Sequence, residues 1–281
     1  MALGAALVAP AAGALELLTN PPRNIAPLPN FLSAGACHVE SSSHRVSCDN
    51  PCVTTTARSV AWPRLSNTPA CTGYVLRAIN DAKSTLGEPP IVLPTNWYQL
   101  TAQRQLFVII NLERRSLGYP PYLGLNPALS AEAQRAARAY GDPAVTRGFP
   151  MGNDPSGYPG FAGAWSAGLN ALEADYGWLY ADGWATTSSA TWNQDCTSTS
   201  APGCWVHRDG LLGSGERMVG GVGVGCTTCE MGAGWAMVKG QASWVLVIER
   251  PRAKPPAMQF TWASELPYLR ASSSLTGTLG Q

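Results

Sequence analysis

The chain contains few charged residues and very few histidines. Asp, Glu, Lys and Arg make up 13% of its 281 residues, and there are only three histidines. A charged share of about a quarter is usual in soluble domains. The net charge of +1 provides neither the basic surface of a nucleic-acid-binding protein nor a field that would attract acidic substrates. No run reaches about 18 uninterrupted apolar residues, so the sequence predicts no membrane span.

Several common catalytic and metal-binding patterns are also missing. There is no G-x-S-x-G nucleophile elbow, because "GAWSAG" misses its spacing by one residue. Cys226-Thr-Thr-Cys229 has no second C-x-x-C or H-x-x-H pair that would complete a zinc tetrad. The glycines of "GSGERMVGGVGVG" have the wrong spacing for a dinucleotide-binding loop and indicate a close-packed strand. The sequence therefore predicts no cofactor and no tightly bound metal.

Cysteine and tryptophan, by contrast, are well represented. Eight cysteines in a chain rich in Pro and Gly indicate disulfides formed in an oxidising compartment, and hence a secreted protein. Their spacing favours the local pairs Cys196–Cys204 and Cys226–Cys229, and leaves the connectivity of the other four open. The ten tryptophans suit a core and also a groove that binds sugar or lipid. The other four cysteines are Cys37, Cys48, Cys52 and Cys71.

The chain divides into four predicted parts. Residues 1–14 are an apolar Ala/Leu run that ends in an A-x-A pattern but lacks a basic start, which favours a truncated signal peptide over a plain apolar tail. Residues 15–94 form a Cys-rich, largely loop-like extension with one helix, which disulfides would hold in place. Residues 95–252 form the main domain, and residues 253–281 form a tail with little periodicity.

Hydrophobic periodicity and end signals predict four helices followed by three strands. The strongest helix has Thr101 as its N-cap and ends at Gly118, and the next is capped by Asn126 with Pro127 at its first position. Helices first and strands last indicate an α+β fold. The helices cover residues 71–87, 101–118, 126–143 and 164–183, and the strands cover 218–226, 234–240 and 243–250.

The stretch "GCWVHRDGLLG" (residues 203–213) places His207, Arg208 and Asp209 in succession behind a Cys and a Trp. A catalytic site, a metal site and a structural network are the three interpretations. A catalytic base would have no identifiable serine to activate, and a metal would need acidic ligands that no spacing singles out. A neutral His satisfies one donor and one acceptor, and an Arg paired with an Asp can be partly buried. These properties favour a hydrogen-bonded, charge-balanced cluster.

Two motifs together resemble the CAP superfamily of SCP-like extracellular domains, in its secreted bacterial branch. "NLERRSLGYPPYLGLNPALSAEAQRAA" resembles the N-R-x-x-x-G-x-x-P…L…A opening of that superfamily. "CWVHRDGLLG" followed by "VGGVGVGC" resembles its H-R-x-x-[IL]-L motif and the strand after it, and "WLYADG" precedes them. The resemblance covers about residues 95 to 250. It implies an α-β-α sandwich around a small antiparallel sheet, with a central groove that in many members carries two His and two acidic residues.

Most of those groove residues do not carry over to this chain. His207 matches the motif histidine, but no histidine follows the helix that ends at Tyr140. The G-E-N tripeptide of the family is here Gly163-Ala164-Trp165, so its glutamate is lost. The family has an acidic residue three positions after Trp178. This chain has Ala181 there, and Asp182 follows it. One groove residue in four is kept, so a metal-dependent activity is not expected.

The favoured function is non-catalytic binding of a lipid, sterol or glycan in a groove at or outside the cell envelope. One alternative is an extracellular hydrolase of peptide or cell-wall material that uses His207, and the other is a structural or interaction protein without a small ligand. The hydrolase needs a second titratable group within hydrogen-bond reach of His207, and the binder needs an open aromatic-lined pocket. The predicted ligand contacts are His207, Arg208, Asp209, Asp182, Trp178 and Trp205, with Tyr180, Trp184 and Trp192 as further stacking surfaces.

Overall fold

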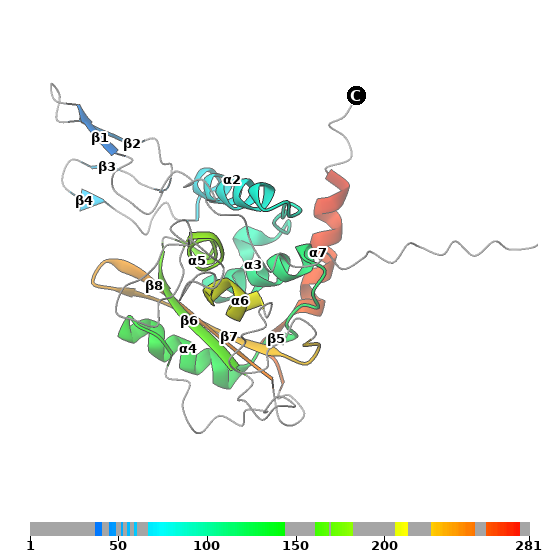
Figure 1. Cartoon of the computed structure of the whole chain (residues 1–281). Helices are drawn as coiled ribbons and strands as arrows, with labels where there is room; N and C mark the ends of the chain where they lie inside the picture. Colours follow the sequence, from blue (N-terminus) through cyan, green and yellow to red (C-terminus); the bar gives the residue numbers. More distant parts are fainter. Residues whose placement is uncertain are drawn as a thin grey trace, which may run out of the picture.

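The computed structural model of the chain describes residues 37–40, 45–48, 52, 55–56, 59–60, 67–143, 161–168, 170–181, 206–212, 226–250 and 257–275. Within them lie two short hairpins and a five-stranded sheet with helices around it (Figure 1). The hairpin strands are β1 (Cys37–Glu40), β2 (Arg45–Cys48), β3 (Thr55–Thr56) and β4 (Ser59–Val60). The strands of the sheet are β5 (Gly124–Leu125), β6 (Phe161–Ala167), β7 (Glu230–Val238), β8 (Gln241–Glu249) and β9 (Phe260–Thr261). The helices are α2 (Pro69–Thr85), α3 (Ala102–Ser116), α4 (Pro127–Ala139), α5 (Ala171–Tyr176), α6 (Val206–Leu212) and α7 (Trp262–Leu275), with short turns η2 (Trp97–Gln99) and η3 (Gly177–Ala181).

The first three predicted helices are confirmed, because their end signals act locally. The Thr101 hydroxyl accepts a hydrogen bond from the Arg104 amide at the start of α3. The Asn126 side chain accepts from two amides in the first turn of α4, at 2.8 and 3.2 Å. Gly118 has a φ of 80°, the left-handed conformation in which glycine ends a helix without strain. The predicted strands at 234–240 and 243–250 correspond to β7 and β8, whereas 218–225 lies outside the described residues.

The prediction of a helix over 164–183 is wrong in its first part. Residues 161–167 form β6, which pairs along its whole length with β8. The helix α5 begins only after Asn170, whose side chain accepts from the Glu173 amide at 2.9 Å. The helical spacing of the apolar residues does not reveal this boundary, because the cap lies inside the periodic stretch. Beyond it, the backbone continues from α5 into the π-helical turn η3.

The predicted antiparallel sheet is in fact mixed, with the strand order β6-β8-β7-β5-β9. β5 runs parallel to β7, with Leu125 opposite Met231, and antiparallel to β9. Both β5 and β9 have only two residues, too few for a hydrophobic alternation to be visible in the sequence. The tail after Pro251, whose weak periodicity predicts a segment that wraps the domain or is disordered, contributes β9 and α7. Phe260 and Trp262 pack against Phe107 of α3, with ring centroids 5.8 and 6.4 Å apart.

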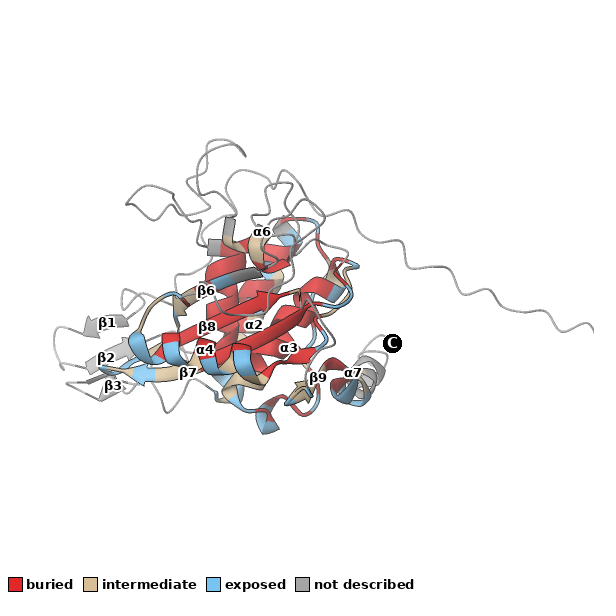
Figure 2. Cartoon of the chain, turned by 90° about the horizontal axis from the view of Figure 1, so that it is seen from below, coloured by how far each residue is buried: buried red, intermediate tan, exposed pale blue. Residues whose placement is uncertain are grey.

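The sheet separates two apolar cores (Figures 1 and 2). On one face α4 packs closely on β7, where a Cβ atom at Gly232 would lie 2.2 Å from the carbonyl carbon of Leu129. On the opposite face lie α3, α5 and α6, with α2 packed against α5. The core on this face includes Ile79 of α2 together with Leu106 of α3 and Leu246 of β8. It therefore joins helices from both sides of the predicted boundary at residue 94.

Two disulfides lie within the described residues. The predicted pair Cys226–Cys229 is confirmed, and it precedes β7 directly. Cys52 is bonded to Cys71, which ties the N-terminal segment to the first turn of α2. Cys37 and Cys48 lie opposite each other in the register of β1 and β2. The predicted pair Cys196–Cys204 lies outside the described residues.

Candidate functional site

The structure places the H-R motif on α6 but brings only part of the predicted ligand site into view. Arg208 is buried, with 3% of its surface exposed, whereas His207 is half-buried. Asp209 belongs to the same helix, and its side chain is not among those described. Asp182 and Trp205, like Trp184 and Trp192, lie outside the described residues.

The two predicted aromatic contacts that can be placed are buried rather than open to a ligand. Trp178 is 1% exposed, and its indole Nε1 donates to the carbonyl of Trp165 at 3.0 Å. Tyr180 is 2% exposed and forms part of the surroundings of Arg208. Both side chains therefore belong to the core of the domain, which is the usual place for a large aromatic residue.

Arg208 is held by groups far away in the sequence. Its guanidinium forms an ion pair with Glu88, 120 residues earlier in the chain. It also donates to the carbonyl of Leu179 at 3.4 Å and lies over the ring of Tyr180, 5.1 Å from the centroid. The sequence predicted a pair between Arg208 and its neighbour Asp209, whereas the carboxylate described beside Arg208 is Glu88. The motif cation is thus bound to the loop that follows α2.

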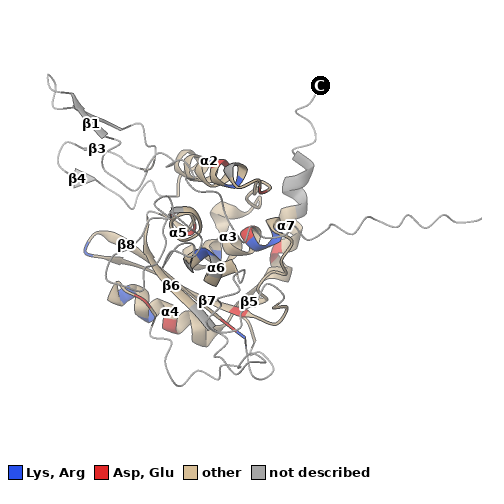
Figure 3. Cartoon of the chain, in the orientation of Figure 1, with Lys and Arg blue, Asp and Glu red and all other residues tan. Residues whose placement is uncertain are grey.

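Glu88 belongs to a larger set of charges, which we call the buried charge cluster. Lys83 of α2 is fully buried, and its Nζ lies 2.7 Å from Glu113 Oε2 and 3.3 Å from Glu88 Oε2. It also donates to the Ser116 hydroxyl at 2.8 Å. The Tyr180 hydroxyl donates to the same Glu113 oxygen at 2.9 Å. Charged residues are visible on α2, α5 and α6, the helices around this point (Figure 3). The cluster consists of Lys83, Glu88, Glu113, Asp175, Tyr180 and Arg208.

Asp175 is the one acid of the cluster that has no cation of its own within the described part of the chain. It is fully buried, and neither carboxyl oxygen has a hydrogen-bond partner among the described residues. Burial raises the pKa of Asp175 well above its ordinary value, and the neighbouring Glu113 adds to the rise, although Lys83 and Arg208 oppose it. A protonated Asp175 leaves two carboxylates facing two cations. The cluster is then electrically neutral, which is the condition for keeping ionised groups in an apolar interior.

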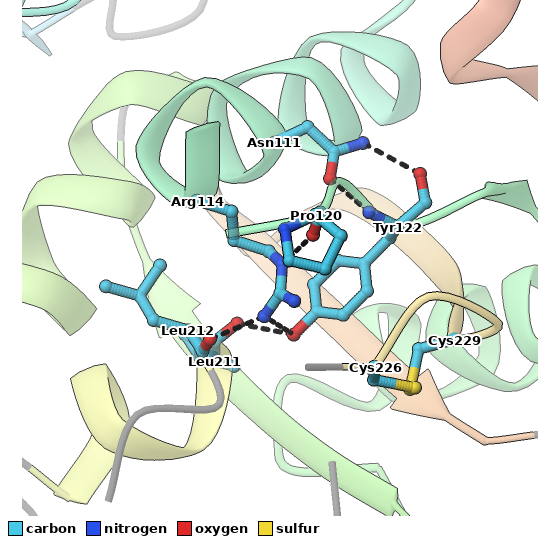
Figure 4. The surroundings of a disulfide bond; sticks show 8 residues. All are labelled: Asn111, Arg114, Pro120, Tyr122, Leu211, Leu212, Cys226 and Cys229. Atoms are coloured by element: carbon cyan, nitrogen blue, oxygen red, sulfur yellow. Dashed lines mark hydrogen bonds between the residues drawn. A yellow bond between two sulfur atoms is a disulfide. The ribbon is translucent and has the colours of Figure 1, made fainter. Parts of the chain in front are cut away.

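A second buried arginine belongs to the other motif, on α3 (Figure 4). The Arg114 guanidinium donates to the carbonyl of Leu212 and, at 3.0 Å, to the hydroxyl of Tyr122. That hydroxyl donates in turn to the carbonyl of Leu211 at 2.8 Å. Asn111 fixes the backbone of Tyr122 through two hydrogen bonds, at 2.7 and 3.2 Å. The two motifs therefore meet at α6, because Arg114 binds the last carbonyl of this helix and Arg208 anchors its middle.

A partly exposed aromatic pair lies on the α4 face of the sheet. Tyr140, which ends α4 in a left-handed conformation (φ 56°), contacts Trp165 of β6 edge to face, with ring centroids 4.8 Å apart. The Trp165 indole donates to the Ser243 hydroxyl at 2.9 Å, and its backbone amide donates to Asp142 at 3.1 Å. The Tyr140 hydroxyl donates to Gln241 at 2.5 Å. Tyr140 ends the helix after which the family resemblance predicts a groove histidine, and Trp165 follows Ala164, which stands at the position of the predicted glutamate.

Most of these residues were missed by sequence reasoning. Lys83, Glu88 and Glu113 are widely separated along the chain, and no spacing connects them. One signal was available for Lys83: it is one of only three lysines in the chain, and it lies one helical turn from the apolar residues Ile79 and Leu86. Burying a rare lysine there requires acidic partners. Arg114 was quoted only as part of a motif, without a role of its own.

Comparison of the chain with protein-family models, curated proteins and solved structures finds no match. The part of the chain that the structure describes contains no group of three or more His, Cys, Asp or Glu side chains that could hold a metal ion. None of the helices placed by the structure is long and apolar enough to cross a membrane.

Proposed function

We propose that this chain is an SCP-like extracellular domain that binds a glycan or apolar ligand without catalysing a reaction on it. The proposal includes the α-β-α sandwich and the secreted location that the family resemblance implies. Helices on both faces of a central sheet and the two disulfides are compatible with both.

The state of the motif arginines supports a non-catalytic role. Arg208 and Arg114 are buried, and their guanidinium groups contact Glu88, Tyr122 and main-chain carbonyls rather than solvent. A group that stabilises a reacting substrate must be able to reach it. These contacts instead fix the position of α6, so the motif is best explained as a framework for the domain.

The observation that carries the binding proposal is the aromatic pair of Tyr140 and Trp165. Both rings are partly exposed, and polar side chains surround them. Aromatic surface beside a few fixed polar groups is the usual composition of a small-ligand site. A sugar ring presents C–H groups on its faces and hydroxyls at its rim, which fits this combination best. The glycan is therefore the ligand class that we favour over a lipid or sterol.

The test compares Trp165→Ala with a matched control, Trp235→Ala, in titrations with soluble N-acetylglucosamine oligomers. Trp235 is also half-buried, but it contacts Trp244 and packs against the core on the opposite face of the sheet. We expect wild type and Trp235→Ala to bind alike and Trp165→Ala to lose about tenfold in affinity, or about 1.4 kcal/mol. Vesicles of phosphatidylcholine with cholesterol test the lipid and sterol alternative.

Two outcomes would reject this proposal. One is equal affinity of wild type and Trp165→Ala for every probe. The other is release of shortened products from peptide or cell-wall substrates that stops in His207→Ala, which would establish the hydrolase instead.

A further inference from the structure

Two buried glutamates face each other at one end of the sheet. Glu230 is the first residue of β7 and lies directly opposite Glu249, the last residue of β8. They are 0% and 3% exposed. Because side chains alternate along a strand, Glu230 points to the same face as Gly232, and Glu249 to the same face as Val247. This is the face covered by α4.

The carboxyl pair, Glu230 and Glu249, lies beside the beginning of α4. Asn126, the N-cap of this helix, donates from Nδ2 to Glu230 Oε2 at 2.6 Å. Within the described part of the chain, Glu230 Oε1 and Glu249 Oε2 have no hydrogen-bond partner. The Asn126 backbone amide also donates to the carbonyl of Met231, which fixes the start of α4 against β7.

The charged groups of the surrounding elements leave the pair without a bonded cation. On α4, Arg135 is engaged with Glu132 at 2.5 and 3.1 Å. Arg250 follows the end of β8 directly, but no ion pair joins it to either glutamate within the described residues. On β6, the residue opposite Glu249 is the uncharged Phe161. Two carboxylates that face each other in an apolar site without a cation repel each other, so one of them retains a proton.

The surroundings decide which glutamate keeps its charge. Glu230 receives the Asn126 hydrogen bond and lies near the positive end of the α4 dipole, and both favour a carboxylate. Glu249 has neither contact. Burial and then the neighbouring Glu230 raise the pKa of Glu249 to about 7, from an ordinary value of 4.5. Burial also raises the pKa of Glu230, and the Asn126 hydrogen bond opposes that rise.

We propose that the carboxyl pair is a pH-sensitive latch that holds the end of the β7–β8 ladder against the start of α4 while one proton is bound, and loosens when that proton leaves. Below neutral pH the pair carries one negative charge, which the Asn126 amide and the helix terminus accept. Above neutral pH it carries two, and repulsion acts between two adjacent strands and the helix that covers them.

The raised pKa of Glu249 determines whether stability rises or falls with pH. The folded state holds a proton on Glu249 that the unfolded state releases near pH 4.5. The contribution of this proton to the free energy of unfolding is fully present below that pH. It is lost as the pH rises through about 7. The melting temperature is therefore expected to fall by several degrees between pH 5.5 and 8.5.

The experiment measures the melting temperature at pH 5.5 and 8.5 for wild type, Glu249→Gln and a control, Glu132→Gln. The glutamine cannot ionise, so Glu249→Gln should lose the part of the fall that Glu249 causes, keep the part that Asp175 causes, and melt above wild type at pH 8.5. Glu132 is a buried acid of α4 that is paired with Arg135, and its variant should keep the wild-type dependence. Equal dependence in Glu249→Gln and wild type would overturn the proposal.

A second measurement on the unmodified protein does not depend on how well a variant folds. The side-chain carboxyl carbon of Glu249, followed by NMR as the pH is raised, should titrate close to neutrality together with a shift at Glu230. Titration of Glu249 near 4.5 would overturn the latch.

Discussion

The buried charge cluster and the carboxyl pair lie on opposite faces of the same sheet, and they bury acidic groups in opposite surroundings. In the cluster, Lys83 and Arg208 form ion pairs with Glu113 and Glu88. In the carboxyl pair, the only hydrogen bond seen to either carboxyl group within the described residues comes from the neutral amide of Asn126. The first site has cations for two of its three acids, and the second has none.

The surplus acid of each site has no cation of its own, and its pKa is raised. Every acid of both sites is at least nine-tenths buried. Among the described residues, no cation binds Asp175 or Glu249 directly, and the pKa of each is raised, first by burial and then by a neighbouring glutamate. Desolvation acts on all of them, but only the surplus acid of each site must give up its charge.

The strongest way to break this contrast is to remove a cation from the cluster with Lys83→Met. The substitution keeps the length of the side chain but leaves Glu113 and Glu88 with one cation between them. We expect a loss of about 3–5 kcal/mol in the free energy of unfolding, as is usual when one partner of a buried ion pair is removed. Denaturant unfolding measures it, and Arg77→Met, an exposed position on the same helix, is the control. A loss no greater than that of the control would contradict the role of Lys83.

The contrast is sharpened by Asp175→Asn, which imitates the protonated acid without its titration. Because burial raises the pKa of Asp175, the folded state must hold a proton that the unfolded state releases, and stability falls as the pH rises above about 3.8. Asparagine removes this loss, so the variant should be more stable than wild type at pH 8 by about 1 kcal/mol or more. The gain should shrink toward pH 4.

The same unfolding curves supply the control for that prediction. Ser84→Asn, at an exposed position of α2, should change stability by less than about 0.5 kcal/mol at both pH values. If Asp175→Asn is instead less stable at pH 8, Asp175 is ionised in the fold and the neutral state of the cluster is wrong.

The sequence predicted those parts of the structure that short-range signals determine. The caps at Thr101 and Asn126 located α3 and α4, because a cap acts on amides within one turn. The disulfide Cys226–Cys229 was predicted from its spacing. The strand β6 was missed because its residues also fit a helical pattern. Its partner strand β8 lies about 80 residues later in the chain, so no local signal indicates the pairing.

The candidate site was predicted less well than the fold, since it is built from long-range contacts. The motif identified Arg208 but not its partner Glu88, which lies in the loop after α2. Nothing in the spacing of Glu230 and Glu249 indicates that they face each other, because that depends on the register of the β7–β8 hairpin. The aromatic pair likewise depends on where α4 ends relative to β6.

The most direct test of the structural role of the H-R motif is a double-mutant cycle on Arg208 and Glu88. The free energies of unfolding of wild type, Arg208→Met, Glu88→Gln and the double variant are compared at pH 7. We predict a coupling energy of about 1–3 kcal/mol. Glu88→Gln leaves the buried Arg208 without its carboxylate and Arg208→Met leaves Glu88 with Lys83 alone, whereas the double substitution removes both charges. Additive losses, with a coupling energy near zero, would contradict the account that this arginine holds the domain together.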